Sequence, residues 1–185
     1  MLLLAAVPDF PPVPLHLAGR LEAGEIVVEM RNVPGPPSGT STGLIGAPID
    51  KVWTIMTDFG SYSRYYTGIP RSQMRRRLGR SVQAHFIIEF PWPMPNRWLI
   101  QEFDLYPEQH TVTWKRLDGT VKRFDGAFKF TAWGRDRTLM QYVAVIDPGF
   151  SLMPSWLLSY FTAQSLPGVV SGPRDYMQRM ARAGG

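Results

Sequence analysis

The sequence predicts an α+β protein in which helices cover one face of an antiparallel sheet. Three observations lead to this prediction. Apolar residues recur at helical spacing after Pro48, they alternate with period two over most of 71–147, and helical spacing returns after Pro148 and continues to the carboxyl end. Strands joined by short loops pair with their neighbours, so the middle of the chain predicts an antiparallel meander. A block of strands with helices on either side of it is typical of the α+β class.

The length and composition fit one globular domain. The chain has 185 residues, of which 44% are hydrophobic and 12% aromatic. A chain of this length can form one hydrophobic core, whereas two independent cores would each be small. We expect a proline-rich arm over residues 1–19, which contains PDFPPVP, and a single domain over 20–183. Met1–Val7 is apolar and fits either a native start or part of a targeting segment. No stretch approaches the roughly 20 apolar residues of a transmembrane helix, so we expect a cytoplasmic protein, free or peripheral to a membrane.

The residue counts exclude several kinds of chemistry. The chain has no cysteine, which rules out disulfides, thiolate metal sites and cysteine nucleophiles. Its three histidines, His16, His85 and His110, are far apart in the sequence, and the acidic residues form no pair placed for acid–base work. We therefore expect no metal and no cofactor, and we assign no catalytic residue. What the composition does provide is apolar bulk: ten Phe, seven Tyr, six Trp and nine Met.

The amino-terminal part alternates short elements with breakers. The clearest element is the helix that opens at Pro48, where a first-turn proline is tolerated and Asp50 places negative charge near the positive end of the helix dipole. In chain order we expect a helical turn, a strand, a loop rich in proline and glycine, a second strand, and two small helices: His16–Ala23, Glu25–Val33, Pro34–Thr42, Thr42–Ala47, the helix after Pro48, and Ser61–Tyr66.

The rest of the chain predicts strands followed by a long helix. The expected strands are Arg71–Arg80 with its turn, Val82–Phe90, Arg97–Tyr106, Thr111–Leu117, Val121–Trp133 and Thr138–Asp147. Leu117–Thr120 contains Asp-Gly, the strongest short hairpin signal, and so predicts a tight turn. The final helix carries an apolar stripe with Trp156, Tyr160 and Gln164 along it, and we expect Pro167-Gly168 to interrupt it.

The net charge of +5 is concentrated in one segment, RSQMRRRLGR, which contains Arg71, Arg75, Arg76, Arg77 and Arg80. This run is either a solvated strand and turn or a surface that makes transient contact with an anionic membrane. No zinc-finger, RRM or KH signature accompanies it, so we expect no nucleic-acid partner.

Three stretches resemble the START-like, Bet v 1-like helix-grip superfamily (SRPBCC), whose members include StAR-related lipid-transfer domains, polyketide cyclases and coenzyme-Q-binding proteins. The first stretch is APIDKVW at residues 47–53, which continues through Thr57-Asp58-Phe59 and Tyr62 to Gly68-Ile69-Pro70. The second stretch is PWPMPNR at residues 91–97. The third is Asp147-Pro148-Gly149 together with Met153–Leu157. Together they span nearly the whole chain. One departure stands out: the acidic residue that commonly follows the family's arginine is Trp98 here.

The resemblance implies a curved antiparallel sheet wrapped around a long carboxy-terminal helix, with two small helices after the first strands. Such a fold leaves a cavity between the sheet and the helix, and a largely apolar cavity suits a hydrophobic small molecule. Period-two alternation and the helical stripe select the residues expected to line it: Phe86, Ile88, Arg97, Leu99, Gln101, Phe103, Phe128, Phe130, Met140, Tyr142, Trp156, Tyr160 and Gln164.

Arg97 and the enzymatic alternative remain open at this stage. Arg97 shares a face with Leu99 and Gln101, where its guanidinium would either anchor a polar group of the ligand or pair with an internal carboxylate. We expect binding, and transport or sensing, of a lipid such as a sterol, an acyl lipid or an isoprenoid. The alternative is a metal-free polyketide cyclase or aromatase using Arg97, Tyr142 and Tyr160. A third class, less favoured, is an accessory protein that binds a macromolecule through its basic segment.

Overall fold

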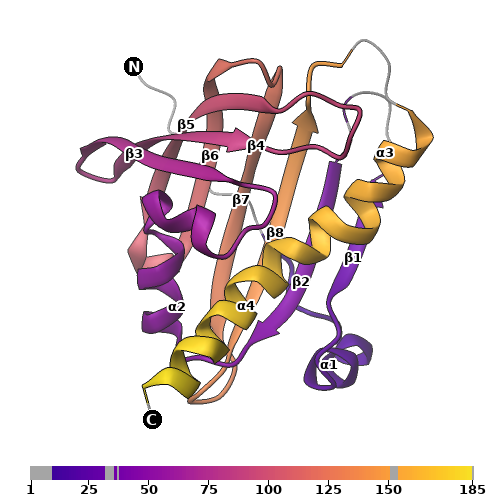
Figure 1. Cartoon of the computed structure of the whole chain (residues 1–185). Coiled ribbons are helices and arrows are strands. Elements are labelled where there is room, and N and C mark those ends of the chain that lie inside the picture. Colours follow the sequence, from indigo (N-terminus) through magenta and orange to yellow (C-terminus); the bar gives the residue numbers. More distant parts are fainter. Residues whose placement is uncertain (1–9, 32–35, 37, 151–153, 185) are drawn as a thin grey trace.

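The computed structural model describes residues 10–31, 36, 38–150 and 154–184. In this part of the chain, eight antiparallel strands form one curved sheet in the order β1-β2-β8-β7-β6-β5-β4-β3 (Figure 1). The strands are β1 Val27–Arg31, β2 Ser38–Ile45, β3 Arg71–Leu78, β4 Ser81–Ile88, β5 Arg97–Tyr106, β6 Thr111–Gly119, β7 Arg123–Ala132 and β8 Thr138–Asp147. Strands β3 to β8 pair in sequence order, and the long-range pairing of β2 with β8 adds the first two strands, so β1 and β3 are the edges.

The long carboxy-terminal helix and the small helices that follow β2 lie on the concave face of this sheet, as Figure 1 shows for the final helix. The helical segments are α1 Leu15–Glu22, α2 Ile49–Met56, the 3₁₀ turns η1 Phe59–Arg64 and η2 Pro107–Gln109, and the run formed by α3 Ser155–Tyr160, the π turn η3 Phe161–Ser165 and α4 Leu166–Ala183. This is a helix-grip fold, and it confirms the predicted α+β class. No helix among the described residues is long and apolar enough to span a membrane.

Helix α4 packs closely on strand β2 because the facing residues of that strand are small. A Cβ on Gly39 would lie 2.6 Å from Cδ1 of Leu166, and one on Gly43 would lie 2.8 Å from Cγ1 of Val170. The buried Ser41 lies between these two glycines on the same face. The contact holds the helix against the β1–β2 side of the sheet, which leaves space between the helix and the strands on the other side.

The carboxy-terminal helix runs through Pro167-Gly168, where the sequence predicts an interruption. Proline lacks the N–H that would bond to the carbonyl four residues earlier, and the wider π turn η3 lies directly before Pro167. The helix therefore accommodates the proline by local widening instead of ending. Pro173 lies six residues later inside regular α-helix, where it leaves the carbonyl of Val169 without an intrahelical donor.

Two local predictions are wrong. Strand β2 begins at Ser38, inside the segment predicted as a loop, because pairing with β8 from Ser38↔Val145 onward outweighs the local turn preference. The Asp-Gly turn is also absent: Asp118 and Gly119 are still in β6, paired with Ile100 and Leu99 across a bulge. Gly119 has φ +128°, a conformation suited to glycine at an irregular strand position.

The predicted short helix near His16 exists as α1, and it covers the opposite, convex face of the sheet at one corner. Leu21 is fully buried there in a small cluster with Val27, Leu44 and Leu139. Glu22 lies within reach of Arg137 and accepts a hydrogen bond from the indole of Trp133. The arm that precedes α1 is also attached to the sheet, because Gln141 donates to the carbonyl of Pro11.

Candidate ligand-binding cavity

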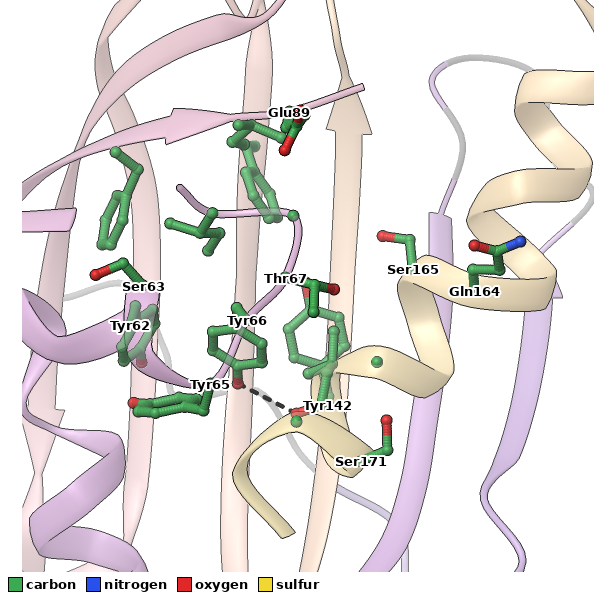
Figure 2. A pocket seen from close by; sticks show the side chains of 18 of the residues that line it. Tyr62, Ser63, Tyr65, Tyr66, Thr67, Glu89, Tyr142, Gln164, Ser165 and Ser171 are labelled. Atoms are coloured by element: carbon green, nitrogen blue, oxygen red, sulfur yellow. Dashed lines mark hydrogen bonds between the residues drawn. The ribbon is translucent and has the colours of Figure 1, made fainter. Parts of the chain in front are cut away.

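A cavity of about 440 Å³ lies between the concave face of the sheet, the segment after α2, and one face of η3 and α4. Figure 2 shows this arrangement: Tyr62, Tyr65 and Tyr66 lie on one side, Tyr142 lies on the sheet, and Gln164, Ser165 and Ser171 come from the helix. A volume of this size accommodates one drug-sized molecule.

Aromatic rings make up the sheet side of the cavity. Trp114 stacks on Tyr142, with ring centroids 5.4 Å apart and planes 28° apart. Around Trp114 lie Phe128, Phe103 and Phe124, at 5.7, 6.2 and 6.2 Å. These distances and tilts fall within the preferred range for aromatic pairs, so the wall is a connected lattice of rings.

Three tyrosines close the cavity on the side of α2, and each hydroxyl is bound to a backbone carbonyl. Tyr62 donates to Met56 O at 2.9 Å and Tyr65 to Ile55 O at 3.2 Å, so both bind the end of α2. Tyr66 donates across the cavity to Val169 O on α4 at 3.1 Å, the bond drawn in Figure 2. These hydroxyls hold the segment after α2 in place between the helix and the sheet.

Burial keeps the tyrosines of the cavity protonated. Removal from water raises the pKa of Tyr62, Tyr65, Tyr66 and Tyr142 well above the usual value, because the phenolate is poorly stabilised there. The pKa of Tyr160 is raised as well, first by burial and then by the negative charge of Glu89. All five phenols are therefore neutral at physiological pH and can act as hydrogen-bond donors.

The mouth of the cavity is lined by small and polar residues. We place the mouth where lining residues are exposed or only partly buried, which include Ser63, Thr67, Gly68 and Glu89 on one side and Gln164, Ser165 and Gly168 on the helix. A Cβ on Gly168 would meet nothing within 4 Å, whereas one on Gly172 would lie 2.4 Å from the carbonyl oxygen of Tyr65. The segment after α2 thus contacts the helix at Gly172 and separates from it toward Gly168.

A second apolar cluster closes the end of the cavity near α3. Phe90 and Phe161 line the cavity and pack with the fully buried Leu157. Phe150 contacts Phe90 edge-on at 5.2 Å. This cluster joins the β4–β5 connection to the start of the carboxy-terminal helix.

Eight of the thirteen predicted lining residues do line the cavity: Phe86, Ile88, Gln101, Phe103, Phe128, Tyr142, Tyr160 and Gln164. Gln101 is buried and its Nε2 donates to the carbonyl of Phe124 at 3.1 Å. Strand alternation put the six residues on strands on the concave face, and Tyr160 and Gln164 lie on the predicted helical stripe. That they bind a ligand stays a prediction.

The structure places the other five predicted residues elsewhere. Leu99, Phe130 and Met140 are buried in the main core, and Trp53 of α2 packs edge-on against Phe130, so α2 fills the space in front of that ring. Trp156 is 41% exposed and lies at the edge of the helical stripe, whose buried members are Leu157 and Phe161.

Arg97 lies outside the cavity, beyond Phe150. Its guanidinium lies over the ring of Phe150 at 4.4 Å and makes a long contact, 3.5 Å, to the carbonyl oxygen of Gly149. Among the residues that the structure describes it forms no ion pair, so the predicted pairing with an internal carboxylate is not seen, and a role in ligand binding stays a prediction.

Several lining residues were missed by the sequence analysis. Trp114 follows Val112 at strand spacing, so alternation alone could have identified it. Tyr62, Tyr65 and Tyr66 lie in an irregular segment, where no periodicity shows which side chains face inward. In the described part of the chain no group of three metal-binding side chains comes together.

The sequence model described as "Polyketide cyclase / dehydrase and lipid transport" matches residues 37–170. The chain belongs to this family. Members of the family are described by two activities, so the match establishes a hydrophobic ligand-binding fold of the START and polyketide cyclase type without choosing between them. Curated proteins give no sequence match to the chain.

Solved structures of both kinds share the fold. A STAR-related lipid transfer protein from Xanthomonas axonopodis superimposes with a TM-score of 0.72 at 19% identity, covering 83% of this chain and 93% of that one. The Zhui aromatase/cyclase from Streptomyces sp. R1128 gives 0.67 at 14% identity, covering 87% and 99%. Human STARD10 gives 0.66 at 13% identity, covering 85% and 72%. At these identities the similarity shows the fold alone.

Proposed function

We propose that this protein binds a lipid-type small molecule, such as a sterol, a single-chain acyl lipid or an isoprenoid, and carries or senses it in the cytoplasm. The observation that supports this most strongly is the cavity itself. It holds about 440 Å³ of space inside a wall of aromatic and aliphatic side chains, and its polar residues gather mainly at the mouth. Burying apolar surface contributes about 25 cal/mol per Å², so enclosure alone would stabilise such a ligand by several kcal/mol.

Access to the cavity would require the mouth to widen. The segment 65–70 is held to α4 by the Tyr66 bond and the contact at Gly172, whereas a Cβ on Gly168 would meet nothing within 4 Å. The start of the last helix is the other mobile candidate, because the π turn η3 and Pro167 weaken its hydrogen bonding there.

Two variants with the same substitution test whether ligands enter at this mouth. Gly168→Trp places an indole in open space at the mouth, and Gly19→Trp places one in open space on α1, far from the cavity. We expect Gly168→Trp to lose binding and vesicle-to-vesicle transfer of a fluorescent sterol and a fluorescent fatty acid, and Gly19→Trp to retain both. Native mass spectrometry of the protein from its own host should show a bound lipid. The absence of a co-purified lipid together with no transfer by the unsubstituted protein would refute the proposal.

Membrane contact would assist a carrier, and the β3 edge offers a surface for it. Arg71, Arg75, Arg76 and Arg77 lie on this exposed strand, and Arg80 follows it, paired with Glu108 at 2.9 Å. Each basic residue near an anionic surface contributes about 1 kcal/mol. We expect vesicles with anionic lipid to bind the protein at low salt, and the triple variant Arg75→Gln, Arg76→Gln, Arg77→Gln to bind them less. Equal binding by the variant would exclude this edge as the docking surface.

The second candidate is a polyketide cyclase or aromatase acting in the same cavity. The neutral hydroxyls of Tyr142 and Tyr160 within the lining favour it, since donors placed in an apolar pocket can orient a polyketone chain. It predicts turnover of a poly-β-ketone that is lost in Tyr142→Phe with the fold intact. Recovery of a tightly bound ligand in chemically unchanged form would favour the carrier instead.

A further inference from the structure

We propose that the stacked pair Trp114–Tyr142 is a hydrogen-bond donor site that selects flat, neutral ligands carrying a carbonyl or similar acceptor oxygen. The inference rests on the proposed function and narrows the ligand class within it. It follows from two donors without partners, from the rings around them, and from the distribution of charge in the cavity.

The first donor is the indole N–H of Trp114. The side chain is 7% exposed and lines the cavity, and its Nε1 is buried without a hydrogen-bond partner among the described residues. A buried donor left unpaired costs about 1–3 kcal/mol, so such groups are rare in folded proteins. An acceptor brought in by a ligand would remove that cost if the indole turned slightly, because Nε1 itself has almost no surface exposed to the cavity in the absence of a ligand.

The second donor is the hydroxyl of Tyr142, which belongs to the ring stacked on Trp114. The three tyrosines on the other side of the cavity, Tyr62, Tyr65 and Tyr66, each donate to a backbone carbonyl. Within the residues that the structure describes, Tyr142 makes no such bond. Its hydroxyl is therefore a donor that the fold itself does not use.

The surrounding rings favour a flat ligand. Phe103, Phe124 and Phe128 lie around Trp114 at centroid distances of 5.7 to 6.2 Å, so a planar molecule beside the pair can stack or make edge contacts on several sides. A flexible acyl chain gains from apolar enclosure but not from these oriented ring contacts.

The positions of the charged residues in the lining favour a ligand whose acceptor group is neutral. The ionisable lining residues other than tyrosine are Arg64, Glu89, Asp175 and Arg179, and they belong to the segment after α2, the end of β4 and α4. Strands β5 to β8 contribute only uncharged side chains to the lining, and Arg97 lies outside it. A carboxylate at the Trp114–Tyr142 pair would be desolvated with no cation to compensate, whereas a carbonyl would not incur that cost.

The test uses two probes with the same tricyclic frame, 9-fluorenone, which has a carbonyl, and fluorene, which has a methylene in its place. We expect the protein to bind fluorenone roughly 3- to 10-fold more tightly than fluorene, the range of one neutral hydrogen bond. Trp114→Phe and Tyr142→Phe should each reduce that preference while changing the affinity for fluorene little. The matched controls Trp98→Phe and Tyr106→Phe change residues outside the cavity lining and should keep the full preference.

A second readout can be taken on the unsubstituted protein alone and then extended to a variant. The carbonyl stretching band of bound fluorenone should lie at lower frequency than in an apolar solvent, and Tyr142→Phe should move it back in part. Equal affinity for the two probes, or an unshifted carbonyl band, would overturn the inference and leave the proposed function intact. Binding of neither probe would count against the proposed function and the inference together.

Discussion

The hydroxyl of Tyr66 donates a hydrogen bond to the carbonyl of Val169, 3.1 Å away, at the position where Pro173 deprives the helix of its own donor. In a regular helix this carbonyl would accept from the N–H of residue 173. Proline has no such N–H, so the carbonyl is available to a side chain from another part of the chain. The pair joins the segment after α2 to the final helix across the cavity.

This relationship predicts a coupling between two substitutions. Tyr66→Phe removes the donor and leaves the Val169 carbonyl unpaired, which we expect to lower the free energy of unfolding by about 1–2 kcal/mol. In a Pro173→Ala background the restored N–H of residue 173 can bind that carbonyl, so Tyr66→Phe should cost less there. Urea denaturation of the four proteins in a double-mutant cycle measures the difference. Additive effects would show that the two residues do not share the carbonyl.

Two glycines one helical turn apart should respond to alanine in opposite directions. Gly172→Ala places a methyl 2.4 Å from the carbonyl oxygen of Tyr65, a backbone atom, so the segment after α2 must shift and we expect a loss of about 1–3 kcal/mol. At Gly168 the added methyl meets nothing within 4 Å, and replacing a helical glycine should stabilise by roughly 0.5–1 kcal/mol. Thermal and urea unfolding of the two variants test the contrast, and a loss of stability in both would contradict the open space at Gly168.

The buried tyrosines predict a steep loss of stability at high pH. Burial raises the pKa of Tyr62, Tyr65, Tyr66 and Tyr142, so they stay protonated in the folded protein above pH 10, where tyrosines of an unfolded chain ionise. The unfolded state then binds fewer protons than the folded state. Stability that is present below about pH 10 is therefore lost as the pH rises, by about 1.4 kcal/mol per pH unit for each such tyrosine.

Tyrosinate absorbance and circular dichroism measured together over the alkaline range check this expectation. Ionisation of the buried tyrosines should coincide with unfolding, and Tyr142→Phe should make the dependence of stability on pH less steep by one tyrosine. A gradual rise of the tyrosinate signal to completion before the fold is lost would show that these phenols are accessible.

Much of the sheet could be predicted because its signal is local. The bounds Arg97–Tyr106 and Thr138–Asp147 match β5 and β8, since period-two alternation needs no knowledge of the partner strand. The same alternation placed Phe86, Phe103, Phe128 and Tyr142 on the face that lines the cavity. It failed at Ser38–Thr42, where a loop-like sequence is in a strand because β8 lies beside it.

The sequence by itself determined the α+β class, the order of the strands along the chain and the concave face of the sheet, because alternation and helical spacing are properties of neighbouring residues. Only the tertiary structure decided which part of that face stays open. Close packing of α4 on Gly39 and Gly43 moves the helix toward β2, and Trp53 of α2 covers Phe130. The space that remains lies in front of Trp114 and Tyr142, with the tyrosines after α2 opposite. These contacts join residues far apart in the chain, and their effect depends on how side-chain volumes fit together, which no local pattern encodes.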